Sequence, residues 1–345
     1  MKLPCCLNRS FVLNCLPLGA IVLYSLCLSS PVQSQIIPDN TLPTNSRVTI
    51  NGTTLEIDQG TAKDSNLFHS FETFSIPTGN TALFKNSTTI QNIITRITGN
   101  FPSSIDGIIR VDGSANLFLI NPNGIVFGPN AALDIGGSFF ASTANRINFA
   151  DGTTFSATNP DVSSTLTVTV PVGLGFGDNP SPILVQGIGH TLTVSDQIFS
   201  PVFGAGMSSS GLQTQSGKTL ALVGGDVILD GGVLTAPGGR IELGSVNSGT
   251  VNLHPTLSGW TLSYEGVSNF GTIQLSQRAL ADASGLVGGS IHVQGARVTL
   301  SDGSKILIQS QQPNPTQAQS SGNINVNASE LLELDGMALD GVLRT

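Results

Sequence analysis

Short segments in which apolar and polar residues alternate follow one another along most of the chain after residue 35. This period of two is typical of β-strands, whose successive side chains point to opposite faces. No segment there keeps apolar residues at i, i+3, i+4 and i+7 for three turns, as an amphipathic helix would. The pattern predicts strands at 166–170, 191–194, 227–229, 240–243, 250–253, 272–275 and 297–300.

Turn-forming dipeptides separate these predicted strands. Asp-Gly and Asn-Gly pairs supply residues that tolerate a positive φ, which many tight turns require. Strands of about five residues with a turn about every 8 to 12 residues predict an all-β protein. The pairs are Asp106-Gly107, Asp112-Gly113, Asn123-Gly124, Asp151-Gly152, Asp230-Gly231, Asp302-Gly303 and Asp335-Gly336.

An internal repeat near the C-terminus distinguishes between the all-β architectures. Its second copy begins 33 positions after the first (322 − 289 = 33), although the last strand of the two copies aligns only after a shift of one residue. The matched positions are Gly289 with Gly322, Ile291 with Ile324, Val293 with Val326, Asp302-Gly303 with Asp335-Gly336, and 298–300 with 332–334. A looser third copy is predicted from Gly225 to Gly231.

Stacked repeats of this kind favour a right-handed parallel β-helix with an N-terminal capping region. Each coil of short strands lies on the previous one, so inward apolar residues form one core and Asn and Thr line up in ladders. With about 20 to 25 residues in a coil, the chain would form about 12 to 15 coils. The alternative is a pair of β-sandwich domains.

The first 34 residues have the features of a secretory signal peptide. Lys2 and Arg9 precede an apolar stretch at 11–28, and the small residues Val32 and Ser34 stand before a predicted cleavage after Ser34. An uncleaved membrane anchor is the alternative, because about 18 apolar residues could just cross a bilayer. All four cysteines lie in this segment, so the mature chain is predicted to contain no disulfide.

Composition narrows the classes of function. Hydrophobic residues make up 39% of the chain, enough for a large core, while charged residues make up only 10%. The net charge of -8 argues against nucleic-acid binding, which needs a basic face to neutralise phosphates. We therefore expect no nucleic-acid partner.

The segment 105–143 contains the densest motif of the chain. Residues 117–120 (LFLI) predict a buried strand, and 125–127 (IVF) predict the return of the chain to the core. Between them Asn121, Pro122, Asn123 and Gly124 form a predicted tight turn, in which proline restricts φ and Asn-Gly supplies the left-handed positions. Taken alone, this is a well-formed turn and nothing more.

The stretch as a whole resembles the two-partner secretion domain, also called the haemagglutination activity domain, of filamentous haemagglutinin-like exoproteins. Asn121, Pro122, Asn123, Gly124 and Ile125 match that family's NPNGI motif. The blocks 66–71, 93–99 and 104–107 are similar to its flanking blocks, in the wording of cyanobacterial members. The family's NPNL motif is absent, and 86–90 (NSTTI) stand in the region where it would lie.

The resemblance implies a secretion signal that a partner protein reads. Members of the family cross the inner membrane by the general secretory machinery, pass unfolded through an outer-membrane β-barrel transporter with periplasmic POTRA domains, and fold outside the cell. The resemblance also assigns transporter recognition to 121–125. The chain would then be secreted or held at the outer cell surface, and its further partners would be host-cell or surface glycans or proteins.

The resemblance also suggests a division of the chain. We assign 1–34 to the signal peptide, 35–160 to the core of the two-partner secretion domain and 161–308 to the continuing β-helix. The Pro/Asn/Gln-rich segment 309–321 is predicted to be a loop or linker, and 322–345 an incomplete β-helix coil.

No residue pattern in the chain predicts an enzyme, a metal site or a cofactor. His69, His190, His254 and His292 lack metal-ligand spacing and are expected at surface or coil positions. Gly217-Lys218-Thr219 lacks the first glycine of a phosphate-binding loop, since Leu212 occupies that position. A β-helical polysaccharide lyase or glycosidase would need paired or clustered carboxylates, whereas the acidic residues here are mostly single members of turns.

The sequence therefore predicts a secreted exoprotein of the two-partner type that acts in surface association or adhesion without catalysis. One alternative is a truncated or vestigial exoprotein that retains only the secretion domain. The other, from a different class, is the lyase or glycosidase. The sequence alone names neither the adhesion ligand nor the oligomeric state.

Overall fold

The computed structural model describes residues 36–160, 166–194, 202–206, 208, 210–257, 259–310 and 322–335. These residues contain thirty strands and no helix, so none of them forms a helix that could cross a membrane. They belong to one compact unit, Ser34–Thr345. The predicted signal peptide at 1–34 and the four cysteines lie outside the described residues.

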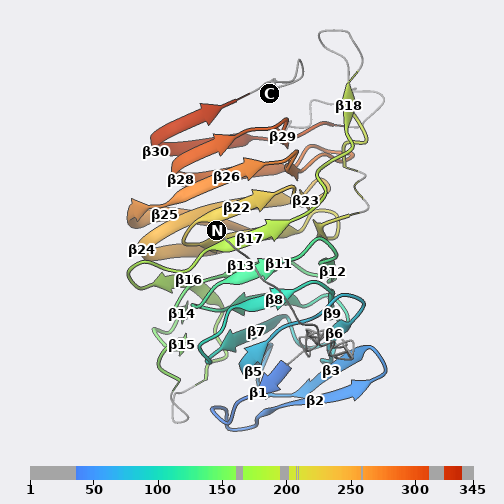
Figure 1. The fold of residues 1–345 in the computed structure, drawn as a ribbon. Coiled ribbons are helices and arrows are strands. Elements are labelled where there is room, and N and C mark those ends of the chain that lie inside the picture. The colour runs from blue at the N-terminus through green and yellow to red at the C-terminus, as the bar shows by residue number, and fades with distance from the viewer. Residues whose placement is uncertain are drawn as a thin grey trace, which may run out of the picture. The chain divides into compact units, whose positions relative to one another are not determined.

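Parallel strands stack in register on three sides of a β-helix (Figure 1). The first side consists of β5 (Asn66–Phe74), β7 (Asn92–Ile97), β10 (Asn116–Ile120), β13 (Phe139–Ser142), β21 (Thr219–Gly224), β24 (Arg240–Thr256), β28 (Ser290–Leu300) and β30 (Ile324–Leu334). The second side consists of β8 (Ser103–Ile105), β11 (Ile125–Phe127), β17 (Ile183–Gln186), β22 (Val227–Asp230), β26 (Thr272–Ser276) and the ends of β28 and β30.

The third side shows how many coils the described residues form. Its two sheets contain β3 (Thr54–Gln59), β6 (Thr81–Phe84), β9 (Ile108–Val111) and β12 (Ala132–Asp134), then β20 (Leu212–Gln213), β23 (Val233–Thr235), β27 (Leu280–Asp282) and β29 (Lys305–Leu307). One strand per coil gives eight coils, fewer than predicted. The reason is that the strands at 146–149, 154–156, 171–176 and 259–270 pair antiparallel outside the stack, so they add no coils.

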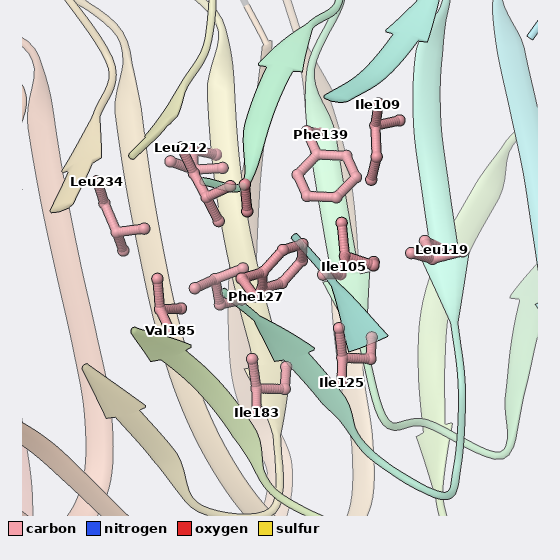
Figure 2. Close-up of a cluster of buried hydrophobic side chains, with 14 of the residues drawn as sticks. Ile105, Ile109, Leu119, Ile125, Phe127, Phe139, Ile183, Val185, Leu212 and Leu234 are labelled. Carbon is pink, nitrogen blue, oxygen red and sulfur yellow. The ribbon is translucent and has the colours of Figure 1, made fainter. Parts of the chain in front are cut away.

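Inward apolar side chains from all three sides form the main core. Figure 2 shows Phe127 among Ile105, Ile125, Ile183 and Val185, which come from successive strands of the second side. Phe127 is fully buried, as are Ile105, Ile125 and Ile183 to within 1%. Because each coil adds residues to the same row, the period-two pattern of the sequence becomes one continuous core.

An antiparallel sheet covers the outer face of the first side, and we call it the cover sheet. It consists of β14 (Arg146–Phe149), β15 (Thr154–Ser156), β16 (Pro171–Phe176), the second half of β24, and β25 (Gly259–Phe270). Beneath it, Phe68, Ile94, Phe118 and Phe140 point outward from four consecutive coils into a second apolar cluster. Strands β5, β7, β10, β13 and β21 of the first side are therefore buried on both faces over most of their length, which explains their apolar runs.

The remaining strands lie at the start of the stack and in one excursion. β1 (Ile36–Pro38) and β4 (Thr61–Lys63) pair antiparallel with β5, and β2 (Ser46–Asn51) pairs antiparallel with β3, so an antiparallel region caps the N-terminal end of the coils. β18 (Thr193–Val194) and β19 (Val202–Phe203) pair with each other, and the excursion packs on the third side, where Val202 joins a small apolar cluster with Val233 and Leu280.

Most predicted strands are confirmed, including those at 227–229, 240–243, 250–253, 272–275 and 297–300. The segment 191–194 is a strand only at its last two residues, and the strand predicted at 166–170 is wrong. There the backbone carbonyls of Thr167 and Thr169 accept hydrogen bonds from Asn66 Nδ2, and the Thr167 hydroxyl bonds Asp151. These side-chain bonds hold the backbone in place of a strand partner.

The 33-residue repeat is confirmed as stacked strands. Ile291 pairs with Ile324 and Val293 with Val326, and a register shift after Gly295 then pairs Val298–Leu300 with Leu332–Leu334, which is the predicted one-residue slip. The predicted third copy is wrong. Ile241 lies under Ile291, whereas Val227 lies under Ile273 on the second side. The sequence pattern alone did not show which side each copy occupied.

The last described strand, β30, pairs with β28 alone among the described residues. The side chains of Leu331, Leu332 and Leu334 on this strand are 45–50% exposed. We expect hydrogen exchange at the amides of Leu331–Leu334 to be much faster than in β28. A strand that is paired on one side can open locally without unfolding the rest of the protein. Deleting 331–345 is expected to leave the melting temperature almost unchanged. Strong protection of these amides in a dilute monomer would instead mean that a cap covers this end.

Candidate functional site

The 121–125 motif forms the corner between β10 and β11. It follows the buried strand Asn116–Ile120 and precedes Ile125–Phe127, as the sequence predicted. The amide of Gly124 donates to the carbonyl of Asn121 at 3.1 Å, which closes the turn. Gly124 has a φ of 110°, in the region that favours glycine, and Ile125 is fully buried in the main core.

Asn121 uses every hydrogen-bonding group of its side chain inside the protein. Its Nδ2 donates to the carbonyl of Phe101 and to Ser103 Oγ, both at 3.0 Å. Its Oδ1 accepts from the amide of Asn123 at 3.0 Å and from Asn123 Nδ2 at 3.2 Å. The residue is fully buried, so any replacement would leave buried polar groups without partners.

Asn123, like Asn121, forms a hydrogen bond to the corner of the preceding coil. Its Nδ2 donates to the carbonyl of Gly99 at 2.7 Å, while Asn121 holds the carbonyl of Phe101. The segment 99–101 is therefore bound by two amide side chains of the next coil. Its own aromatic side chain, Phe101, points away and is 68% exposed.

The folded motif therefore offers few free groups to a partner. Asn121, Gly124 and Ile125 are buried, and only Pro122 and Asn123 are partly exposed. The turn itself is formed as predicted, and in the folded state its side chains also fix the register of the neighbouring corner. The residues it brings together, Asn121 and Asn123 with 99–103, lie apart in the sequence and were not expected to touch.

An asparagine ladder joins the first residues of β5, β7 and β10, at the other end of β10 from the motif, as the stacked coils predicted. Asn92 Nδ2 donates to Asn66 Oδ1, and Asn116 Nδ2 donates to Asn92 Oδ1, each at 3.0 Å. The ladder is closed at its far end by the amide of Ser138, which donates to Asn116 Oδ1 at 2.9 Å. It joins three consecutive coils through side chains alone.

The 86–90 segment, where the NPNL motif was sought, connects β6 to β7. Ile90 is 8% exposed and joins the main core, while the amide of Ile90 donates to the carbonyl of Ser87 at 3.1 Å. The Oδ1 atom of Asn86 is buried without a hydrogen-bond partner among the described residues. This turn therefore lacks the interlocking amides of 121–125.

The expectation of surface or coil positions is wrong for two of the four histidines. His69 lies in β5, fully buried, and His292 lies in β28 with its side chain only 16% exposed. His190 is buried but lies in a coil segment, as expected. His254 is exposed but lies in β24. The signal for His69 was its apolar neighbours Phe68 and Phe71, which place this stretch inside the fold.

Burial lowers the pKa of His69 to about 3, with the charge of Asp58 opposing that effect. Its Nδ1 contacts Ser46 Oγ at 2.9 Å, and its Nε2 has no partner among the described residues. The imidazole is therefore kept neutral in the folded protein. An unpaired buried nitrogen of this kind costs stability that the surrounding packing must offset.

We expect the free energy of unfolding to decrease as the pH falls from about 6.5 towards 3. The folded pKa lies below the unfolded one, so the unfolded chain binds the extra proton over this range. His69 contributes at most about 1.4 kcal/mol per pH unit. Urea unfolding at several pH values measures the slope; His69→Phe should flatten it above pH 4.5, whereas the exposed control His254→Gln should not. An equal slope in all three proteins would contradict the prediction.

The other chemical patterns occupy structural positions. Thr219 begins strand β21, so the 217–219 segment leads into a strand and not a helix. The buried carboxylates form hydrogen bonds inside the protein. Glu242 bonds Arg240 and His292, and Asp282 accepts from the backbone amides of Gly206 and Ser284. Across the described ranges, no three His, Cys, Asp or Glu side chains come together as metal ligands.

Comparisons with known proteins complete the description of this site. The chain is similar to a crystal structure of the HMW1 secretion domain from Haemophilus influenzae, with 16% identity, a TM-score of 0.43 and 84% of each chain covered. It is also similar to a filamentous hemagglutinin secretion domain, with 13% identity, a TM-score of 0.38, 86% of this chain and 96% of that chain covered. A search of curated proteins found no match.

The matched region covers most of the chain and includes the 121–125 corner, the cover sheet and every strand of the stack up to the start of β30. The family model of the TPS secretion domain matches residues 34–326. The chain therefore belongs to the TPS secretion domain family, the secretion domain of exoproteins that two-partner secretion exports across the outer membrane through a partner transporter.

Proposed function

We propose that this protein is exported by a transporter with periplasmic POTRA domains and then acts in surface association or adhesion outside the cell. The observation that carries the proposal is the match to the TPS secretion domain over residues 34–326. Stacked coils present an extended surface, and solenoid proteins bind through such surfaces. We therefore propose a glycan or a protein on a cell surface as the ligand. The predicted signal peptide, 1–34, would direct the first step by the general secretory machinery.

The 121–125 motif is proposed to serve the transporter before the chain folds. The amides of Asn121 and Asn123 are used internally in the folded protein, so a partner could contact them directly only in the extended chain. After export the same groups would close the corner onto 99–103. One short segment would thus act twice, first in recognition and then in folding.

We also propose that the protein catalyses no reaction. The matched family consists of secretion domains without enzymatic activity. The buried carboxylates Glu242 and Asp282 are held by internal hydrogen bonds, from the amide of Leu262 to Glu242 and from the amide of Ser284 to Asp282. Assays of the purified protein on acidic and neutral polysaccharides should show no release of reducing ends.

Export can be tested by expressing the full chain with and without a transporter encoded beside its gene. We expect the protein in the medium only with the transporter, and in the periplasm without it. Binding of the exported protein to cells and to glycan surfaces then tests adhesion separately. Equal amounts in the medium in both strains would reject transporter-dependent export, whereas export without any surface binding would reject adhesion alone.

The proposed division of the chain remains as assigned from the sequence. We propose that 35–160 is the secretion-domain core, that 161–308 continues the β-helix, that 309–321 is a loop or linker and that 322–345 is an incomplete coil. Residues 311–321 and 336–345 lie outside the described residues. Limited proteolysis of the exported protein, with cleavage expected first within 309–321, tests these boundaries.

A further inference from the structure

The cover sheet packs against a row of aromatic side chains that point outward from the first side of the coils. Phe68 of β5 contacts Phe155 and Phe149 of the cover sheet at ring-centroid distances of 5.1 and 5.8 Å. Two coils further on, Phe118 and Phe140 stack at 4.4 Å. The cover sheet therefore needs several coils in place before its apolar face has a complete partner.

Trp260 of the cover sheet packs against that stacked pair. Its ring lies edge-on to Phe118 at 5.4 Å and to Phe140 at 5.7 Å, and the residue is 5% exposed. It is the single tryptophan of the chain. Its fluorescence is therefore a local probe of the contact between the cover sheet and the coils.

A buried arginine joins the cover sheet to the coils and to the N-terminal segment. Arg96 of β7 is 1% exposed. Its Nη1 donates to the carbonyl of Ser156 at 2.7 Å, its Nε to Ser70 Oγ at 2.9 Å, and its Nη2 to Thr41 Oγ1 at 2.9 Å. The guanidinium also lies 4.1 Å from the ring centre of Phe155.

Asp39 carries the negative charge near Arg96, and hydroxyl groups connect the two side chains. Asp39 accepts hydrogen bonds from Ser70 Oγ at 2.7 Å, from Thr41 Oγ1 at 2.6 Å and from Thr98 Oγ1 at 2.5 Å. Ser70 and Thr41 also bond Arg96, so they bridge the carboxylate and the guanidinium. Burial lowers the pKa of Arg96 to about 10, with Asp39 opposing that effect. The arginine is thus satisfied only when 39–41, 70 and 155–156 are all present.

We infer that the cover sheet closes over the finished coils in a separate, late folding step, and that Arg96 locks this closure to the N-terminal segment. The partners of Arg96 lie 55 residues before it and 60 residues after it in the chain. When a chain folds from its N-terminus, Asp39, Ser70 and Arg96 come together before Ser156 is available. Before the cover sheet packs, the guanidinium of Arg96 and the outward aromatic side chains are in contact with water. Packing of the cover sheet buries both.

Refolding of the purified secreted protein tests the order of events. After dilution from denaturant, far-UV circular dichroism follows strand formation, and Trp260 fluorescence follows closure of the cover sheet. We expect most of the circular dichroism signal to return in a faster phase, with the fluorescence change confined to a slower one. Coincident single-exponential phases for both probes would overturn a separate closure step.

Substitution of Arg96 tests the lock. In Arg96→Met, amide exchange should rise by about tenfold or more at 39–41, at 70 and at 154–156, with β10 and β21 unchanged, because the guanidinium bonds that are lost go to Thr41, Ser70 and Ser156. The matched control is Arg146→Met, an exposed arginine on β14 of the same sheet. A uniform rise throughout the coils, or an equal rise in the control, would overturn the assignment to Arg96. If Arg96→Met fails to fold, the two-probe kinetics of the unaltered protein still decide whether closure is separate.

Discussion

Replacing Asn121 and Asn123 together by alanine is expected to reduce the protein in the medium several-fold, while export across the inner membrane continues. The double change removes the hydrogen bonds to the carbonyls of Gly99 and Phe101 and leaves the buried hydroxyl of Ser103 without its Asn121 partner. Each unpaired buried group costs about 1–3 kcal/mol, enough to change the amount of folded protein several-fold. Immunoblots of medium, periplasm and cytoplasm, with the transporter co-expressed, measure the distribution.

Asn92→Ala provides the control that separates recognition from folding. Asn92 is also buried and loses comparable amide bonds, to Asn66 and Asn116, but lies outside the motif. If 121–125 is recognised in the extended chain, the motif variant should be secreted less than Asn92→Ala at equal loss of stability. Equal secretion of the two variants would show that the motif acts through the fold alone, and an unchanged yield from the double variant would reject any role in export.

Gly289→Ala is expected to prevent correct stacking of the last coils. A Cβ at this position would overlap the carbonyl oxygen of Gly239 in the preceding coil and would lie 2.8 Å from the carbonyl oxygen of Ala283. Backbone atoms on both sides cannot move without breaking the pairing of β24 with β28. We expect a loss of about 3 kcal/mol or more in the free energy of unfolding.

The matched control for this position is Gly79→Ala. Gly79 has a φ of 79°, and no atom lies within 4 Å of the place that a Cβ would occupy, so the change brings conformational strain without a clash. That strain costs about 1–2 kcal/mol. Urea unfolding followed by circular dichroism compares the two variants. A smaller loss for Gly289→Ala than for Gly79→Ala would show that the coils can separate at this corner.

The sequence by itself determined the class of fold and much of its register. Alternation over 227–229, 272–275 and 297–300 placed strands correctly. Each of these strands turns one face to the main core, so every second side chain must be apolar. The repeat even contained the slip between 298–300 and 332–334, since stacked strands must keep their apolar residues in line. The 121–125 turn was also evident, because Pro and Asn-Gly act through local backbone geometry.

Only the tertiary structure decided what lies over the coils and which polar groups meet. Alternation cannot show that Phe68 and Phe118 face outward into a second core, because a strand buried on both faces is simply apolar throughout. The partners of Arg96 lie in three distant segments, and those of Asn121 in the preceding coil, so no local pattern joins them. The same is true of 166–170, where Asn66 and Asp151 hold an alternating segment out of any sheet.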